Sequence, residues 1–265
     1  MDKAKELIKV NNNKRIFSVI AGRQNTGRGT RGRKWLSSKE INGNLYMTVV
    51  YKMSSVPVPI TLMPLRIATL IAPCIEKRII SSSSSSSSLY LKWPNDVLID
   101  NEKVCGILIE IEDNSVLVGI GCNVLEAPKV DSNGTDGGRA STSIFKHNQN
   151  IMNNNNNNND NNISTNSDNK VESISTSDPP LLGLAVDIVE AIDEWLQNED
   201  TASSVLKDFE NKMTPVAQRV RTDRLVDESL LGKEILPLRL NSDGSLVVRV
   251  LDDNRETTLV ADYLW

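Results

Sequence analysis

Short apolar runs separated by turn-forming residues dominate the first half of this chain. Residues 16–21, 45–51 and 115–120 are rich in Val, Ile, Leu or Tyr, which predicts strands. Residues 91–110 read LKWPNDVLIDNEKVCGILIE, in which a Pro-Asn-Asp corner and an Asp-Asn turn interrupt the apolar runs. Pro has a fixed φ, and Asn and Asp side chains bond nearby backbone, so these residues favour turns. The stretch therefore predicts a hairpin.

Apolar residues at helical spacing mark the helices. Residues 62–80 are apolar enough to predict a buried helix, and residues 181–198 repeat apolar side chains at the spacing of an amphipathic helix. Shorter helices are predicted at residues 3–10 and 205–213. The pattern thus predicts an α/β (α+β) protein in which a sheet is flanked by helices.

The pattern changes after residue 215. Short apolar runs alternate there with Asn-Ser-Asp-Gly and Asp-Asp-Asn turns, which predicts strands at 216–220, 234–240, 246–250 and 257–260. We therefore expect two domains, residues 1–214 and a small C-terminal β-barrel at residues 215–265.

Two low-complexity tracts interrupt the first domain. Residues 81–88 are eight consecutive serines, and residues 153–159 are seven consecutive asparagines within a longer polar region. Homopolymers of polar residues cannot build a core. We predict flexible insertions at 81–88 and at about 145–178.

Composition excludes several classes of protein. The chain has 265 residues and a net charge of -4, which argues against general nucleic-acid binding. No apolar stretch approaches the ~18–20 residues of a membrane span, and the first residues lack a secretory signal. The three cysteines, at 74, 105 and 122, are an odd number and widely spaced, which predicts free thiols in a reducing, cytoplasmic compartment. His147 is the one histidine, which argues against zinc sites and histidine-based triads, and we expect it to be solvated.

The predicted hairpin carries the first candidate chemistry. Lys92, Asp96 and Lys103 lie close to its turns, and two lysines with a carboxylate suit a polyphosphate or a leaving phosphate. The alternative is an ordinary surface hairpin with solvated charges.

Residues 24–35 carry the second group of residues with candidate chemistry. They read QNTGRGTRGRKW. Glycine lets backbone approach a ligand closely, and arginine offers a planar fork of donors to phosphate or carboxylate. An aromatic residue beside such a loop can stack on a base. The alternative is a disordered linker that binds nucleic acid loosely, but the predicted strands at 16–21 and 45–51 frame the loop with structure.

Five elements in this order resemble the catalytic domain of the biotin–protein ligases (biotin–[acetyl-CoA-carboxylase] ligase, holocarboxylase synthetase). The most specific is Lys-Trp-Pro-Asn-Asp at 92–96, followed by the Gly-Arg loop. The others are Asn-Leu-Tyr at 44–46, Lys-Val-Cys-Gly-Ile-Leu-Ile-Glu at 103–110 and Gly-Ile-Gly-Cys-Asn at 119–123. The resemblance implies a class II synthetase-like mixed sheet with flanking helices, followed by a small SH3-like barrel.

The resemblance also implies the reaction. Family members activate biotin with ATP as biotinyl-5′-AMP, and then transfer biotin to a lysine of a biotin carboxyl-carrier domain. ATP, biotin and Mg²⁺ are the implied small molecules, and Asp96 is a candidate Mg²⁺ ligand. Neither DNA nor a membrane is an expected partner. Both steps pass through concentrated negative charge, which preorganised cations stabilise.

The family's roles transfer onto matching positions. The implied catalytic residues are Lys103, Arg28, Asp96 and Lys92. The implied biotin-binding residues are Gln24, Gly27, Arg28, Gly29, Thr30, Lys103 and Gly106. The implied ATP- or adenylate-binding residues are Arg31, Arg33, Trp35, Asn95 and Asn123.

Two departures from the family pattern stand out. Thr30 stands where the family usually has an arginine, so we expect looser retention of the adenylate. The strand and Ser-Thr-Asn turn that normally precede the first helix are missing, as if the N-terminus were truncated. These departures keep open a non-catalytic biotin-binding or regulatory paralogue, and the wider fold keeps open a lipoate or octanoate transferase.

Overall fold

The structure is a computed structural model that describes residues 1–10, 17–38, 40–79, 88–129, 140–147, 180–220 and 228–260. The predicted insertions lie outside these residues, apart from Ser88 and residues 145–147. The predicted helices and strands all occur, with bounds shifted by a few residues.

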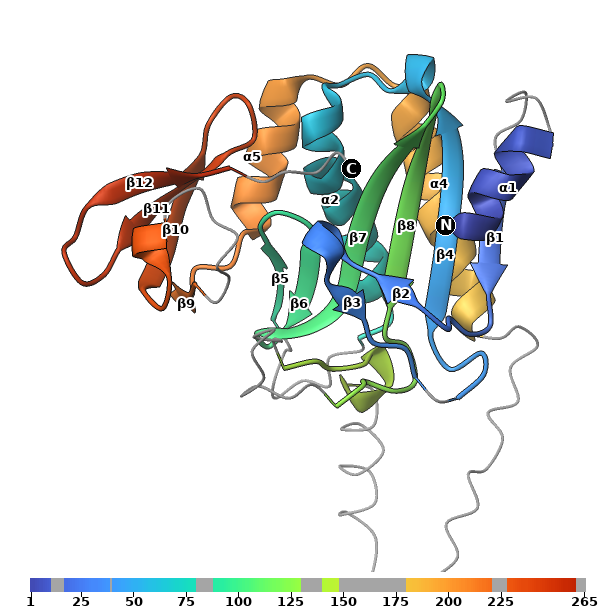
Figure 1. Cartoon of the computed structure of the whole chain (residues 1–265), viewed down its shortest axis with the longest axis horizontal. Coiled ribbons are helices and arrows are strands. Elements are labelled where there is room, and N and C mark those ends of the chain that lie inside the picture. Colours follow the sequence, from blue (N-terminus) through green and yellow to red (C-terminus); the bar gives the residue numbers. More distant parts are fainter. Residues whose placement is uncertain are drawn as a thin grey trace, which may run out of the picture.

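A six-stranded sheet forms the centre of the larger part (Figure 1). Its spatial order is β1-β4-β8-β7-β6-β5, and neighbouring strands pair antiparallel. Its strands are β1 (Phe17–Ala21), β4 (Leu45–Lys52), β5 (Leu89–Lys92), β6 (Asp96–Ile99), β7 (Glu102–Glu112) and β8 (Ser115–Cys122). Parallel pairing is confined, among the described residues, to isolated bridges such as the one between Lys103 and Ser141.

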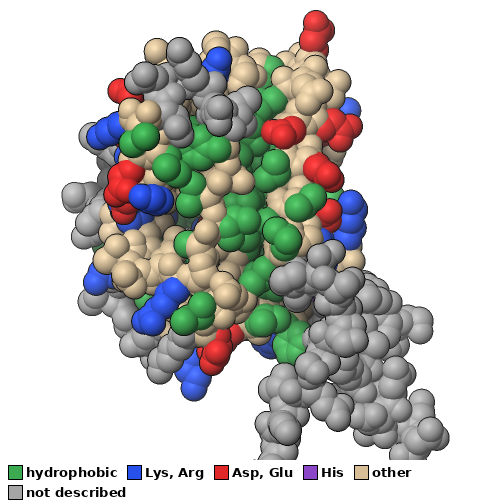
Figure 2. All heavy atoms as spheres, turned by 90° about the vertical axis from the view of Figure 1, so that its right-hand side faces the viewer, with side chains coloured by type: hydrophobic (Ala, Val, Ile, Leu, Met, Phe, Trp, Pro, Cys, Tyr) green, Lys and Arg blue, Asp and Glu red, His purple; other side chains and the backbone are tan. Residues whose placement is uncertain are grey.

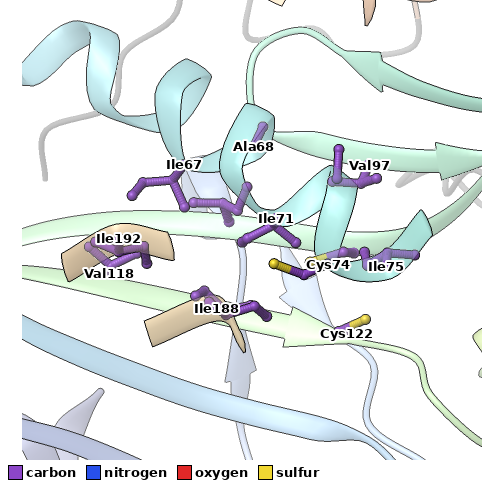
Figure 3. Close-up of a cluster of buried hydrophobic side chains, with 14 of the residues drawn as sticks. Ile67, Ala68, Ile71, Cys74, Ile75, Val97, Val118, Cys122, Ile188 and Ile192 are labelled. Carbon is purple, nitrogen blue, oxygen red and sulfur yellow. The ribbon is translucent and has the colours of Figure 1, made fainter. Parts of the chain in front are cut away.

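Three helices cover one face of this sheet and build the main core. They are α2 (Met63–Glu76), α4 (Pro180–Gln197) and α5 (Ala202–Lys212). Figure 3 shows Ile71 of α2 and Ile188 of α4 packed together with Val97 and Val118 of the sheet. Each of these four side chains is fully buried. Since burying one such side chain contributes about 1.5–3 kcal/mol, this core fixes the sheet on which the candidate site lies.

The opposite face carries α1 (Asp2–Val10) and the Gly-Arg loop. Ala4 and Ile8 of α1 pack on Val50 and Leu117 in a second, smaller cluster. Residues of β7 and β8 alternate between the two faces, as strand geometry requires. The residues that face away from the main core therefore form the floor of the candidate site.

The C-terminal part is a separate four-stranded antiparallel sheet of order β12-β11-β10-β9. Its strands are β9 (Gln218–Arg219), β10 (Glu234–Leu240), β11 (Leu246–Val250) and β12 (Glu256–Leu259). Closure of this sheet into an SH3-like barrel stays a prediction.

One side chain joins the two parts. Trp93 packs against the main core and against the core of the C-terminal sheet. Its Nε1 donates to the carbonyl of Gly244, in the turn between β10 and β11, at 2.9 Å. The Lys-Trp-Pro-Asn-Asp corner is therefore anchored to the C-terminal sheet.

Strand β1 is one edge of the main sheet. Figure 2 shows hydrophobic side chains on the side of the molecule where α1 and β1 lie. Val10 of α1 and Ile20 of β1 are among the exposed apolar residues, at 77% and 49% exposure. The candidate site lies away from this edge, on the central strands.

Candidate functional site

The centre of the site is an ion pair between neighbouring strands. Lys103 Nζ of β7 lies 2.6 Å from Asp96 Oδ1 of β6. Asp96 directly follows the Trp-Pro-Asn corner, and it pairs with Lys92 across the β5–β6 hairpin. The hairpin predicted from the sequence thus brings Lys92, Asp96 and Lys103 together.

Positive charge surrounds the carboxylate. Burial raises the pKa of Asp96, but the charges of Lys103, Lys92 and Arg33 outweigh it and hold this pKa below its ordinary value. Asp96 is therefore ionised at neutral pH. The site is built to hold negative charge, and the residues that favour one carboxylate would equally favour a phosphate or a carboxylate of a ligand.

Two glycines form the floor beside this pair. Gly106 of β7 and Gly121 of β8 are cross-strand neighbours, and the indole of Trp35 lies on both. A Cβ at either position would meet the ring at 2.7 Å, so only glycine admits the indole here. Lys103 Nζ lies 5.0 Å from the Trp35 ring centre, within the range of a cation–π contact. Trp35 Nε1 is buried and has no hydrogen-bond partner in the described part of the chain.

The Gly-Arg loop is a small hairpin, which the sequence pattern did not predict. Strand β2 (Gly27–Arg28) pairs with β3 (Lys34–Trp35), and a 3-10 turn, Thr30–Gly32, joins them. Gly29 N–H donates to the carbonyl of Arg33 at 2.8 Å. This pairing places Trp35 at the end of a short strand, from which its ring reaches the glycine floor.

Thr30 fixes the side chain of Arg33. The Arg33 guanidinium donates through Nη2 to Thr30 Oγ1 at 2.6 Å and through Nε to the Thr30 carbonyl at 3.2 Å. Since Arg33 also contributes to the positive charge around Asp96, Thr30 acts on the site through Arg33. The prediction for the Arg31 side chain lies outside the described side chains.

Arg28 lies on the α1 side of the loop. Its Nη1 is 2.7 Å from Asp2 Oδ1, and its Nη2 is 3.5 Å from Glu110 Oε1. Gln24 accepts a hydrogen bond from Ser37. These contacts do not test the roles of Arg28 and Gln24 toward biotin, which stay predictions.

The two predicted asparagines are buried and take part in the fold. Asn95 is 6% exposed, and its amide donates to the carbonyl of Ile107. Asn123 is 1% exposed and donates through Nδ2 to the carbonyl of Thr142 at 3.1 Å. Asn123 Oδ1 is buried without a hydrogen-bond partner among the described residues. It is thus an acceptor that a ligand amine can use.

Residues 140–147, which we call the docking segment, are the part of the site that sequence reasoning left undeveloped. They pack beside Lys103 and Asn123, and residues 144–147 form a helical turn. The expectation that His147 is solvated is wrong, since this side chain is 8% exposed and lies 2.9 Å from Thr142 Oγ1. Residues 140–144 resemble the short Thr-Ser-Leu element that follows the Gly-x-Gly-x-Asn strand in the biotin–protein ligases, and this resemblance indicated an ordered segment.

The predicted Mg²⁺ would need oxygen ligands from the site. In the described part of the chain, no three His, Cys, Asp or Glu side chains gather to hold a metal ion. Mg²⁺ often binds through one carboxylate together with substrate phosphates and water. The residues fit an ion that arrives with ATP, with Asp96 supplying an oxygen.

No helix in the described ranges is long and apolar enough to cross a membrane.

Known proteins share both the sequence and the fold. Residues 1–125 match the biotin/lipoate A/B protein ligase family. The chain is 30% identical over 112 residues to the bifunctional ligase/repressor BirA of Escherichia coli, covering 40% of this chain and 32% of that protein. It is 33% identical over 123 residues to the biotin–[acetyl-CoA-carboxylase] ligase of Mycobacterium tuberculosis, covering 44% and 43%. The matches thus span 32% and 43% of the lengths of these curated relatives, less than half of each.

The similarity in structure covers more of the chain than the similarity in sequence does. The biotin protein ligase from Leishmania major, solved in complex with biotin, has a TM-score of 0.62 and 26% identity, over 98% of this chain and 94% of that one. A second structure of that protein contains biotinyl-5-AMP. The chain thus shares the fold of these biotin protein ligase structures over nearly its whole length. In sequence, the likeness to the biotin/lipoate A/B protein ligase family covers residues 1–125.

Proposed function

We propose that this protein is an ATP-dependent biotin–protein ligase. It activates biotin as biotinyl-5′-AMP and transfers biotin to a lysine of a biotin carboxyl-carrier domain. The observation that carries the proposal is the Lys103–Asp96 pair beside the Gly106–Gly121 floor, on a fold shared over nearly the whole chain with a ligase solved with biotin.

The first step needs the biotin carboxylate and the α-phosphate of ATP to meet without repulsion. Lys103 would bond the carboxylate and an α-phosphate oxygen, with Lys92 and Arg33 adding positive charge toward the pyrophosphate that leaves. Asp96 would orient Lys103 and would share Mg²⁺ with the phosphates. Preorganised donors of this kind stabilise the charge that develops in the transition state.

Binding requires Trp35 to change its contacts. Its ring covers Gly106 and Gly121, where a ligand next to Lys103 would lie. We propose that the indole leaves this floor and stacks on adenine, so that the Gly-Arg loop closes over the adenylate. Arg28, Gln24, Gly27, Gly29 and Arg31 would complete that cover. Asn123 Oδ1, which lacks a partner among the described residues, would accept from the adenine amine.

In the second step, the acceptor lysine attacks the mixed anhydride and releases AMP. The ammonium of that lysine must lose a proton, and the carboxylate of Asp96 would assist. We also propose that residues 1–214 form the catalytic domain and residues 215–265 the small C-terminal domain. The predicted cytoplasmic compartment is consistent with Cys74, Cys105 and Cys122, which are all buried free thiols.

The test is biotin-dependent exchange of pyrophosphate into ATP, with Lys103→Ala alongside. Lys212→Ala is the matched control, because Lys212 of α5 forms a lysine–carboxylate pair with Glu76 of α2, outside the site. Exchange that needs biotin, persists in Lys212→Ala and is lost in Lys103→Ala supports the proposal. Pyrophosphate exchange that needs lipoate or octanoate in place of biotin would indicate a lipoate or octanoate transferase. Biotin binding without exchange would indicate the non-catalytic paralogue.

A further inference from the structure

Strand β8 does not reach Lys103. Its pairing with β7 ends at Cys122 opposite Cys105, two residues short of Lys103. The docking segment takes its place. Lys103 N–H donates to the carbonyl of Ala140 at 2.8 Å, and Lys103 accepts from Thr142 N–H at 3.0 Å. Both backbone groups of Lys103 are therefore held by a segment nearly forty residues further along the chain.

The same segment holds Asn123. The Asn123 amide donates to the Thr142 carbonyl at 3.1 Å, and Ile144 N–H donates back to the Asn123 carbonyl at 3.0 Å. With Nδ2 committed in this way, Oδ1 remains the atom without a partner among the described residues. The docking segment thus contacts the two residues expected to touch biotin carboxylate and adenine.

A side-chain contact closes the docking segment on itself. Thr142 Oγ1 lies 2.9 Å from His147 Nε2, and both side chains are buried, at 0% and 8% exposure. On its other side, His147 Nδ1 lies 3.6 Å from Asp100 Oδ2, in the turn that leads from β6 into β7. Asp100 itself is fixed by Ser88, whose N–H donates to Oδ1 at 2.9 Å. His147 therefore connects Asp100, in the turn before Lys103, with Thr142, whose N–H donates to the Lys103 carbonyl.

We propose that Thr142 and His147 are positioning residues for Lys103 and Asn123, and that their buried contact sets the rate of adenylation. The inference rests on the proposed ligase function. Neither residue is among those expected to contact biotin or ATP. They act by keeping the docking segment in register with Lys103, since a displacement of about 1 Å at a reacting group can cost about 100-fold in rate.

The first experiment does not depend on activity. Thr142→Val keeps the size and the backbone of Thr142 but removes the hydroxyl, and Thr142→Ser keeps the hydroxyl. Amide hydrogen exchange at Lys103 should speed up by about 5-fold in Thr142→Val, which is the effect of losing one ordinary hydrogen bond. The amide of Ile109, within the β7–β8 ladder, should be unchanged. Thr142→Ser should match the natural protein.

The second experiment measures pyrophosphate exchange, corrected for the folded fraction. We expect kcat to fall about 10-fold in Thr142→Val while the KM values for biotin and ATP change less, because ordering of the reacting groups is lost. Lys146→Ala is the control on the same segment, because its pair with Glu102 is exposed.

The outcomes separate the two proposals. Unchanged exchange of the Lys103 amide in Thr142→Val, or equal behaviour of Thr142→Ser and Thr142→Val, overturns the positioning role whatever the enzyme does. A natural protein without pyrophosphate exchange overturns the proposed function, and the amide measurement still decides the positioning role. If Thr142→Val does not fold, His147→Phe removes the same contact at similar volume and carries both measurements.

Discussion

Lys103 and Asp96 hold each other across β6 and β7, with Nζ and Oδ1 2.6 Å apart. The pair lies beside an irregularity in the sheet, since the register of β6 against β7 shifts between Val97 and Leu98. A regular ladder would separate these residues further along the strands. The shift lets the side chain of Lys103 reach back over Gly106 to the carboxylate.

This geometry predicts the effect of Asp96→Asn. The amide keeps the shape of the side chain but leaves Lys103 and Lys92 without their negative partner. We expect the pyrophosphate exchange rate to fall about 100-fold, because Lys103 loses its fixed orientation. Steady-state exchange at saturating biotin and ATP measures it, with circular dichroism as the check on folding. A fall no larger than that of Lys212→Ala would contradict the orienting role.

The position of Trp35 predicts an optical signal. A ligand beside Lys103 must displace the indole from Gly106 and Gly121, which changes the surroundings of a partly buried tryptophan. Addition of biotin, and of biotin with ATP, should change the fluorescence of the natural protein. The chain has 4 tryptophans, so Trp35→Phe is the control that assigns the signal. The same change in Trp35→Phe would show that the indole stays on the glycine floor.

The sequence predicted the main elements because apolar periodicity and turn residues agree there. The hairpin at residues 91–110 is the strongest case, since Pro94, Asn95 and Asp100 mark its corners and strong β-formers fill its strands. The same hairpin brings Lys92, Asp96 and Lys103 together, so the centre of the site also followed from local pattern.

The parts that could not be predicted depend on tertiary contacts. The partners of Arg28 are an example, because Asp2 and Glu110 are 26 and 82 positions away in the chain and bind it on the α1 side. His147 was predicted to be solvated because its neighbours in the sequence are polar. In the fold, its ring lies next to Thr142 and Asp100. No local pattern reveals a contact that only the folded sheet creates.

Burial of His147 predicts a pH dependence of stability. Burial lowers the pKa of His147 from its ordinary 6.5, and Lys146 adds to this, while Asp100 and Glu102 oppose it. The unfolded chain therefore binds this proton at a higher pH than the folded protein does. Stability is lost as the pH falls below 6.5, until the pH reaches the lowered pKa of the folded protein.

The measurement compares Tm at about pH 7.5 and about pH 5 for the natural protein and for His147→Gln. The variant cannot take up this proton, so its Tm should fall less. Other carboxylates titrate in both proteins and cancel in the comparison. An equal fall in the two proteins would show that His147 does not titrate differently on folding.

The bond between Trp93 and Gly244 predicts a stability effect that reaches both parts of the molecule. Trp93→Phe keeps an aromatic ring between the two cores and removes the N–H that donates to the Gly244 carbonyl. We expect a loss of about 1 kcal/mol in the free energy of unfolding, the usual net value of one hydrogen bond. Urea unfolding measures it, and an unchanged midpoint would contradict a structural role for the bond.

Thr30 is one of the two departures from the pattern of the biotin–protein ligases, and the structure shows which contacts the threonine makes. Its hydroxyl and its carbonyl both accept from Arg33, which adds positive charge at Asp96. Thr30→Val removes the hydroxyl at constant shape, so Arg33 should lose orientation. We expect the adenylate to escape more readily, by about 5-fold, the value of one hydrogen bond.

The measurement is release of biotinyl-5′-AMP into solution, with biotin labelling of an unrelated protein as a second readout. Thr30→Ser is the matched control and should behave like the natural protein. Thr30→Arg separates two explanations, because it adds a cation to the loop but cannot accept from Arg33 through a hydroxyl. If retention depends on charge alone, Thr30→Arg labels unrelated protein less than the natural chain does. If retention of the adenylate depends on the Thr30–Arg33 contact, Thr30→Arg labels unrelated protein at least as much as the natural chain does.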